Sequence, residues 1–357
     1  MDGRQRFRVD RLRAVTGAIF AACGLRADHA ATVTDVLLHA ELRGHASHGL
    51  MRVPIYTDRL RRGIVNPAPR IRIERPAPAV LHVDADNGPG AIGSLAALEA
   101  AIEAARGVGA AVAIVAHSNH NGAGSYYVEK AAAAGCLAIG MTNAPPSMAV
   151  HGGKSSAIGT NPIAFAAPVA GGGPLVADLA TSVVARGKII DRARRSEAIP
   201  EGWALDAAGR PTTSAIAAEQ GVILPMAGPK GSALAIMVEA LTGVLAGGRF
   251  GASIGSLYAD FDRSQDLAHF FLVIALEAAD PAGGFAGRLA ALLGELKGGP
   301  VADGVAAIRM PGEPTAEKAQ LLESGEIRLA ANVANDLVRT AQALGVDAEG
   351  LARGAEP

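Results

Sequence analysis

Apolar residues recur at spacings of three and four through the first 70 residues of the chain. Residues three and four apart lie on one face of a helix, so the pattern predicts amphipathic helices over 10–23 and 28–42. Gly44 follows the second helix at the position where a left-handed cap is expected. The segment 1–70 is therefore predicted to be the helical N-terminal part of the protein.

Beyond residue 70, short apolar runs alternate with helical patterns. The runs predict strands over 79–83, 111–116, 137–141, 163–167, 175–177 and 269–276. The last run is apolar enough for the interior of a sheet. Helices are predicted over 94–106, 126–134, 182–192, 232–245, 286–296 and 330–344. Surface loops are predicted at the Gly- and Pro-rich clusters 168–174, 246–252 and 298–304. This order indicates a mixed α/β part over 71–300 and a helical C-terminal part over 301–357.

Composition fits a folded globular protein, because 50% of the 357 residues are hydrophobic and 19% are charged. The length exceeds the roughly 250–300 residues that one hydrophobic core usually serves, so two or three lobes are expected. The net charge is −1, and no block of like charge is present. This argues against nucleic acid or an anionic membrane as a partner.

Several features bear on the compartment. No run of 18 apolar residues is present, so no membrane span is predicted. Cys23 and Cys136 are too few for a disulfide framework and are predicted to be buried thiols. The stretch 11–23 resembles a short lipoprotein signal, but Asp2 and Asp10 break its basic region. An ordinary N-terminal helix in a cytoplasmic protein is the favoured interpretation.

Five residues that bind acids or carry protons lie within ten positions: Arg43, His45, Ser47, His48 and Arg52. Histidine exchanges a proton near neutral pH, and arginine binds a carboxylate through two parallel hydrogen bonds. The cluster therefore suggests a site that holds an organic acid and moves a proton on it. A solvated helix end is the alternative.

A glycine pattern typical of dinucleotide binding, Gly88-Pro-Gly90-Ala-Ile-Gly93, lies between a predicted strand and a predicted helix. Pro89 stiffens the turn, and the next predicted strand ends without an acidic residue for a ribose hydroxyl. A plain strand-to-helix turn is therefore favoured over a Rossmann motif.

Further polar clusters follow predicted strands at 117–124, 141–161 and 176–182. Such connections often carry function, but helix caps and tight turns have the same composition. No histidine pair has metal-ligand spacing backed by a nearby acid. A hydrolase that uses Ser47 is disfavoured, because no nucleophile elbow is present.

Taken together and in this order, the motifs resemble the type 2 malate/L-lactate dehydrogenase family over about residues 10–345. Its relatives include ureidoglycolate, sulfolactate, diketogulonate and piperideine-2-carboxylate oxidoreductases. The motifs are LRGHASHGLMRVP at 42–54, VDADNG at 83–88, SNHNG at 118–122, MTN at 141–143, GTNP at 159–162, DLATSVVARGK at 178–188, PEGWA at 200–204 and GPKG at 228–231.

The resemblance implies NAD(P)-dependent interconversion of a 2-oxo acid and a 2-hydroxy acid. A cyclic imino acid is the alternative substrate, and a binding paralogue without turnover is a further alternative. The implied cofactor is NAD or NADP, with NADPH favoured. The implied fold class is α/β (α+β type), with a non-Rossmann mixed-sheet cofactor domain and a helical domain formed from both chain ends. The implied assembly is a homodimer.

The resemblance also implies roles for individual residues. His48 and His120 match the proton-transfer histidines, Ser47, His48 and Asp178 match a relay described in the imine-reductase branch, and Arg52 suits the substrate carboxylate. The implied cofactor-binding residues are His120, Asn121, Gly122, Asn143, Ala144, Asn161, Asp178, Leu179, Ala180 and Lys230. The chain departs from the family pattern at Asn121, Pro229 and Ser232, which leaves the choice between NAD and NADP open.

Overall fold

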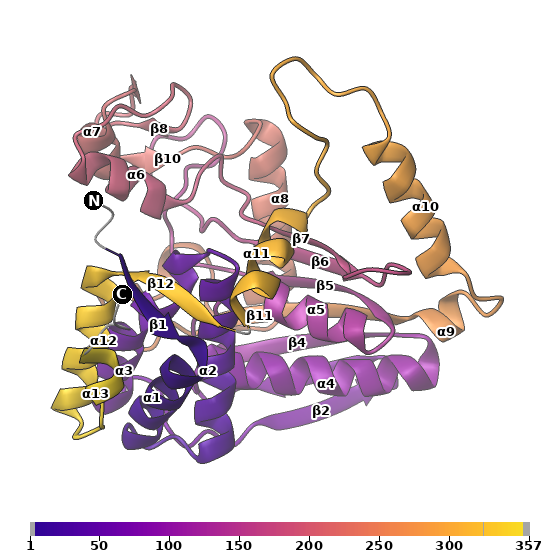
Figure 1. Ribbon diagram of the computed structural model, residues 1–357, viewed down its shortest axis with the longest axis horizontal. Helices are drawn as coiled ribbons and strands as arrows, with labels where there is room; N and C mark the ends of the chain where they lie inside the picture. Colours follow the sequence, from indigo (N-terminus) through magenta and orange to yellow (C-terminus); the bar gives the residue numbers. More distant parts are fainter. Residues whose placement is uncertain (1–3, 324, 353–357) are drawn as a thin grey trace.

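A seven-stranded mixed sheet forms the centre of the protein in a computed structural model that describes residues 4–323 and 325–352 (Figure 1). The strand order is β2-β3-β4-β11-β5-β6-β7. Only β3 and β4 run parallel, and every other neighbouring pair is antiparallel. The strands span Arg72–Ala77, Val80–Asp84, Ala110–Ser118, Leu267–Ala275, Cys136–Thr142, Ile163–Ala167 and Leu175–Leu179, in the order of the sheet. The predicted mixed α/β fold class is confirmed.

Two helices connect neighbouring parts of this sheet and bury their apolar sides on it. Helix α4 (Gly90–Val108) packs on β4 and β11, and α5 (Ser125–Ala133) packs on β5 and β6. Strand β11 lies at the centre, and most of its residues are buried, as its apolar sequence predicts. The polar turns that leave β4 and β5 therefore lie above a rigid core.

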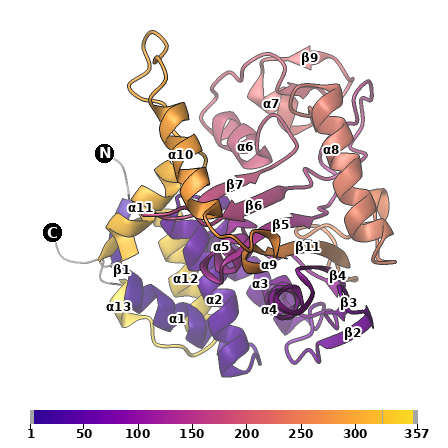
Figure 2. The ribbon, with the colours of Figure 1, turned by 90° about the vertical axis from the view of Figure 1, so that its right-hand side faces the viewer.

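A helical layer packs beside the sheet and combines segments from both ends of the sequence (Figures 1 and 2). Its N-terminal helices are α1 (Val9–Ala22), α2 (Ala27–Leu42) and α3 (Val53–Arg61). Helix α12 (Ala331–Ala343) packs on α1 and α3, and α13 (Glu349–Ala352) lies against α1. Strands β1 (Arg4–Arg8) and β12 (Glu326–Ala330), which the sequence did not predict, pair antiparallel. The loop that carries His48 leaves α2 inside this layer.

A smaller lobe has its own apolar cluster around Ile189, Ile199 and Ile223. It contains α6 (Arg186–Arg194), α7 (Ala215–Glu219) and the short strands β8 (Ala204–Leu205), β9 (Pro211–Thr212) and β10 (Val222–Ile223). The helix predicted over 182–192 begins only at Arg186. Its predicted start was wrong, because the Val183 N–H donates to the Leu224 carbonyl and keeps that segment extended.

Helices α8 to α11 follow the small lobe in the sequence. Helix α8 (Pro229–Glu239) begins three residues earlier than predicted, because proline is well suited to the first turn of a helix, and it ends in the π-helical turn Ala240–Val244. Helices α9 (Leu276–Ala279) and α10 (Phe285–Lys297) form an arm that projects at the right of Figure 1, and no residue of α10 is buried. Helix α11 (Glu313–Glu323), which was not predicted, packs on α2.

Two sequence-based expectations about the compartment can be compared with the structure. Both cysteines are free and buried, as predicted. Across the part of the chain that the structure describes, no helix combines the length and apolar character needed to cross a membrane.

Candidate active site

Two short 3-10 turns after α2 carry the first cluster of polar residues. They span Ala46–His48 and Leu50–Arg52, with Gly49 between them. The buried Glu41 carboxylate accepts the Leu50 N–H at 2.8 Å, and a Cβ on Gly49 would lie 2.1 Å from the same carboxylate. A side chain at position 49 would force the Glu41 carboxylate to move. Glu41 therefore fixes the turn that orients His48 and Arg52.

The structure brings His48 and His120 together from the helical layer and the sheet. Their ring centroids are 5.4 Å apart, and the rings are tilted by 31°. Ser47 Oγ lies 2.9 Å from His48 Nδ1, so the predicted neighbours Ser47 and His48 are hydrogen-bonded. Tyr56 Oη lies 2.5 Å from His120 Nδ1. Sequence reasoning missed Tyr56, although its spacing of four from Arg52 places both residues on one side of the turn into α3.

The hydrogen bonds of His120 define which ring nitrogen carries the proton. The Gly122 N–H donates to His120 Nδ1 at 3.2 Å, so Nδ1 must be an acceptor. The Tyr56 hydroxyl then donates to the same nitrogen. Because a neutral imidazole carries one N–H, that hydrogen is on Nε2. His120 therefore has a hydrogen on the ring nitrogen opposite Tyr56.

Burial keeps His48, His120 and Tyr56 uncharged. Desolvation, followed by the nearby positive charge of Arg52, lowers the pKa of His48 to about 3. The same two causes place the pKa of His120 well below its usual value. Desolvation also raises the pKa of Tyr56, while Arg52 partly opposes this rise. At neutral pH the site thus contains two neutral imidazoles, a protonated phenol and one guanidinium.

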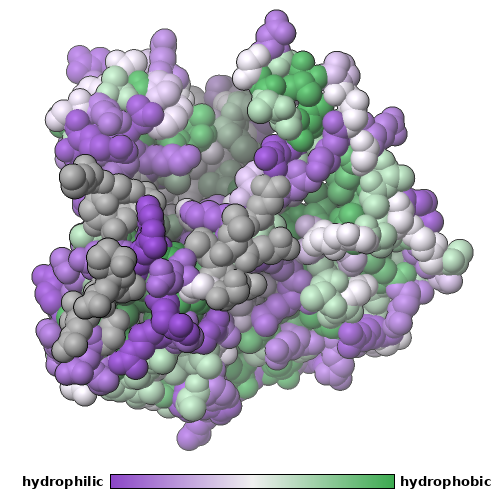
Figure 3. Space-filling view, viewed as in Figure 1, coloured by the Kyte–Doolittle hydropathy of each residue, from purple (hydrophilic) through white to green (hydrophobic). Residues whose placement is uncertain are grey.

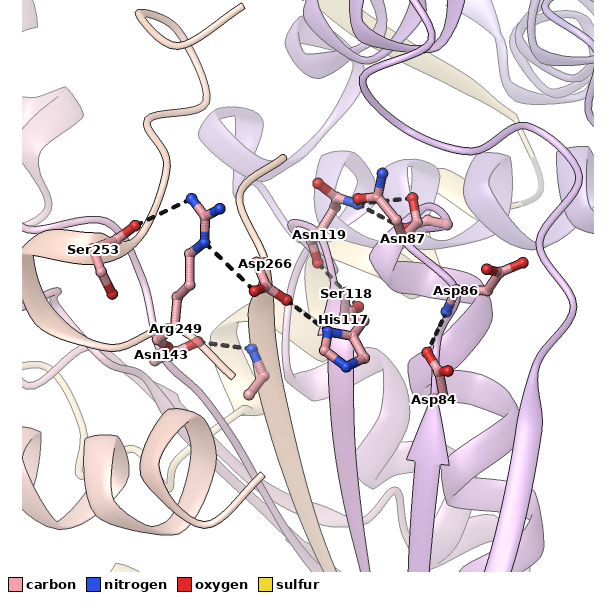
Figure 4. Close-up of polar contacts among 12 residues, drawn as sticks. Asp84, Asp86, Asn87, His117, Ser118, Asn119, Asn143, Arg249, Ser253 and Asp266 are labelled. Carbon is pink, nitrogen blue, oxygen red and sulfur yellow. Dashed lines mark hydrogen bonds and ion pairs between the residues drawn. The ribbon is translucent and has the colours of Figure 1, made fainter. Parts of the chain in front are cut away.

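The turn before α4 supports the segment that carries His120 (Figure 4). The Asn119 side chain donates to the Asn87 carbonyl at 3.1 Å and to the Gly88 carbonyl at 3.0 Å. A Cβ on Gly90 would lie 1.9 Å from the Asn119 carbonyl oxygen. Gly90 of the 88–93 pattern therefore serves close packing against the backbone of the His120 segment.

Asp178 lies at the end of β7, next to the first turn of α5. Its carboxylate accepts the Ser125 N–H at 2.8 Å. Within residues 4–323 and 325–352, no hydrogen bond joins Asp178 to Ser47 or His48. Its negative charge instead acts on His45, where it opposes the lowering of the pKa that burial causes.

The three predicted cofactor-site asparagines use their side chains within the protein. Asn121 donates to Ser94 Oγ at 3.1 Å. Asn143 donates to the Arg249 carbonyl at 3.0 Å and accepts the Ala268 N–H at 2.9 Å (Figure 4). Asn161 accepts the Ala144 N–H at 3.0 Å and donates to Glu239 at 2.6 Å. These three amides are buried, and their hydrogen bonds position the loops that carry them.

The predicted cofactor-site residues Leu179, Ala180 and Lys230 lie at accessible or half-buried positions. Leu179 is 42% exposed at the end of the edge strand β7, and Ala180 follows it half-buried. Lys230 is exposed on the first turn of α8, and it forms no ion pair within the described residues. Gly122 has φ of +81°, and a Cβ there would lie 2.3 Å from Val36. Arg43, from the first cluster, pairs instead with Glu129.

His269, at the centre of β11, links the strands on either side. Its Nδ1 lies 2.8 Å from Thr142 Oγ1, and its Nε2 lies 2.8 Å from Ser118 Oγ. The side chain is fully buried, and desolvation lowers its pKa to about 3. An unfolded histidine has a pKa of about 6.5. Between about pH 3 and pH 6.5, His269 is therefore neutral in the folded protein but protonated in the unfolded chain.

The protein is expected to lose stability as the pH falls from about 6.5 toward 3, and His269 contributes to this loss. Over this pH range only the unfolded chain binds a proton on His269. This lowers the unfolding free energy by up to about 1.4 kcal/mol per pH unit. Urea unfolding of His269→Gln should show a shallower fall of the unfolding free energy between pH 6.5 and 4. His82→Gln, on the exposed side of β3, should keep the wild-type slope. If the unfolding free energy fell equally steeply with pH in all three proteins, His269 would not be the group responsible.

Comparisons with known proteins agree with this arrangement. The sequence pattern of the malate/L-lactate dehydrogenase family matches residues 7–338. The chain is 41% identical over 251 residues to ureidoglycolate dehydrogenase (NAD(+)) of Escherichia coli, covering 70% of this chain and 71% of that protein. It is 41% identical over 265 residues to (2R)-3-sulfolactate dehydrogenase (NADP(+)) of Chromohalobacter salexigens, covering 74% and 78%.

A solved structure gives the same result for the fold. Sulfolactate dehydrogenase of Methanocaldococcus jannaschii superposes with a TM-score of 0.90 at 32% identity, covering 96% of this chain and 98% of that one. The family match spans nearly all of the described residues and includes every motif named above. The chain therefore belongs to the malate/L-lactate dehydrogenase family, as its motifs predicted.

Proposed function

We propose that this protein interconverts a 2-oxo acid and a 2-hydroxy acid with NAD or NADP, and that His120 transfers the proton. The observation that carries the proposal is the group of His48, His120, Tyr56 and Arg52, which places two neutral imidazoles beside one cation. Relatives named for NAD(+) and for NADP(+) support either cofactor. NADPH is the favoured one of the two.

The residues present fit a nicotinamide dinucleotide. The exposed Lys230 has no described carboxylate partner, so its ammonium is available to a phosphate. Leu179 gives an accessible apolar surface at the edge of the sheet. In this proposal the cofactor also contacts the backbone of residues 120–122, 143–144, 161 and 178–180. Since only one strand pair is parallel, we propose binding without a Rossmann motif. When bound, the reduced cofactor supplies the hydride.

His120 and Tyr56 act together on the substrate oxygen in this mechanism. As negative charge develops on that oxygen, the Nε2–H of His120 donates its proton to it. The Tyr56 hydroxyl proton moves to His120 Nδ1 at the same time, so the imidazole stays neutral. Arg52, whose charge opposes the raised pKa of Tyr56, stabilises the phenolate that results, and the phenolate takes up a proton from water before the next turnover. The reverse transfers serve oxidation.

Arg52 and His48 complete the site by holding the substrate. Arg52 is proposed to bind the carboxylate, because its positive charge acts on both histidines and a guanidinium favours an anion. Ser47 orients His48 through Nδ1. The relay of Ser47, His48 and Asp178 stays a prediction. The Ser47–His48 bond supports its first link, whereas Asp178 bonds the Ser125 N–H.

A spectrophotometric screen tests the function. The purified protein, mixed with NADH or NADPH and a panel of 2-oxo acids and cyclic imines, should consume the nicotinamide absorbance with at least one 2-oxo acid. Turnover confined to cyclic imines would move the activity to the imino-acid alternative. Binding of nucleotide and acids without turnover on any member would identify a non-catalytic paralogue instead.

We further propose that 1–70 and 301–357 form one helical domain, that 71–300 form the cofactor domain, and that the protein is a cytoplasmic homodimer. The pairing of β1 with β12 supports the shared domain. Exposed apolar side chains support an assembly interface. They lie on α8 and the turns after it and on α10: Ile236, Met237, Val244, Leu245, Phe250, Leu292 and Leu296. Figure 3 shows green at the upper right, where α10 and the loop after it lie. Light scattering should return twice the chain mass of 36.0 kDa; a single chain mass would exclude the dimer.

A further inference from the structure

A loop of eight residues, 256–263, reaches the substrate end of the site through Tyr258. Arg52 Nη1 donates a hydrogen bond to Tyr258 Oη, and the guanidinium carbon lies 5.4 Å from the centroid of the tyrosine ring. The family motifs gave no role to this segment. We propose that Tyr258 is a substrate-binding residue, and that its hydroxyl and Arg52 together hold the carboxylate of the substrate. This inference rests on the proposed function.

The donors of this pair suit a carboxylate. Arg52 Nε donates to the Ser47 carbonyl at 2.7 Å, and Nη1 donates to Tyr258. Two of the five guanidinium N–H bonds are used in this way, so three remain for a ligand. Tyr258 accepts from Arg52 and therefore keeps its own hydroxyl hydrogen free. A carboxylate accepts several hydrogen bonds, and those between charged partners are the strongest.

The 256–263 loop is held in place by Arg59, which is 1% exposed. Its Nη1 donates to the Leu257 carbonyl at 3.2 Å and to the Asp260 carbonyl at 2.7 Å, and its Nη2 donates to the Arg263 carbonyl at 3.1 Å. Asp260 also accepts the Ser256 N–H at 2.7 Å. A buried cation that binds three carbonyl groups of the loop fixes the backbone on both sides of Tyr258.

The residues just after the 256–263 loop are bonded to the segment that carries His120 (Figure 4). Gln265 Oε1 accepts the His120 N–H at 3.2 Å. Asp266 lies 3.1 Å from His117 Nδ1 and 3.5 Å from Arg249 Nε. His117 and Asp266 both have positive φ, +53° and +56°, which a non-glycine residue keeps only when its surroundings hold it there. Tyr258 and His120 are therefore fixed relative to each other, which a proton transfer to a bound acid requires.

The variant Tyr258→Phe tests the inference, because it keeps the ring over Arg52 and removes only the hydroxyl. With the wild-type substrate, KM for the acid should rise about 10- to 100-fold, the loss expected for a hydrogen bond to a charged group. KM for NAD(P)H should stay unchanged, and kcat should stay within about threefold. Calorimetry with oxamate, a carboxylate analogue of a 2-oxo acid, should show the same rise in Kd.

Tyr126→Phe is the matched control, since the Tyr126 hydroxyl makes no hydrogen bond within the described part of the chain. It should leave KM and the oxamate Kd unchanged. Wild-type turnover with an unchanged KM and oxamate Kd in Tyr258→Phe would overturn the inference and leave the function standing. Absence of wild-type turnover on every substrate would defeat the function instead. The oxamate titration then decides the inference alone: weaker binding by Tyr258→Phe supports it, and equal or absent binding overturns it.

Discussion

His120→Asn is expected to lower kcat by about 10²- to 10⁴-fold, the usual contribution of a positioned proton-transfer group. An asparagine oxygen can accept the Gly122 N–H in place of His120 Nδ1, so the backbone should stay in place. The substituted side chain has no second nitrogen on the side opposite Tyr56. It can therefore neither donate to the substrate oxygen nor pass on the Tyr56 proton. Steady-state kinetics with the substrate found by screening gives kcat and KM.

The control for this substitution is His82→Asn, which makes the same chemical change on the exposed side of β3 and should retain wild-type turnover. Thermal unfolding of both variants separates a catalytic loss from a folding defect. Wild-type kcat in His120→Asn would remove His120 from the mechanism. A large loss in His48→Asn alone would assign the proton transfer to His48.

Gly90→Ala is expected to reduce activity strongly without touching a catalytic side chain. The added Cβ would lie 1.9 Å from the Asn119 carbonyl oxygen and 2.7 Å from the His120 carbonyl carbon. Both contacts are with backbone, so the His120 segment must move. Overpacking of this kind costs about 1–3 kcal/mol in unfolding free energy, and a shift of about 1 Å at a reacting group can cost about 10²-fold in rate. Denaturant unfolding and kinetics on one preparation measure both effects.

Gly107→Ala provides the matched control within the same helix. An added Cβ at Gly107 meets nothing within 4 Å. Alanine favours a helix by about 1 kcal/mol over glycine, so this variant should be at least as stable as the wild type and fully active. If Gly90→Ala behaved like Gly107→Ala, the close contact with the His120 segment would not exist in solution.

Most elements of the fold could be predicted, because each leaves its own periodic pattern. The strand Ile163–Ala167 agrees with its prediction at both ends, and the two N-terminal helices agree within one residue. The order of the sheet could not be predicted. Strand β11 lies between β4 and β5, although many residues separate it from them in sequence. An apolar run indicates that a strand is buried, but it does not indicate which strands pair with it.

The site could be predicted only as far as residue types reveal chemistry. His48, His120 and Arg52 stand out as proton carriers and a carboxylate ligand in one family pattern. Tyr56 does not, since its importance comes from a contact with His120 that the fold creates. Asn143 and Asn161 show the reverse error, in which the residue type suggests ligand binding but the side chain has a structural role. Their amides suit a ligand, but the structure uses them to join loops, and sequence spacing cannot distinguish the two uses.

The pairing of β1 with β12 has a consequence for the order in which the protein forms during synthesis. Arg8 lies opposite Glu326, and α12 packs on α1 and α3. A ribosome releases these partners at very different times, and contacts between distant segments are slow to form. The layer that presents His48 thus stays incomplete while the sheet that presents His120 has already emerged. The two imidazoles come to face each other last, so an unfinished chain has a core before it has an active site.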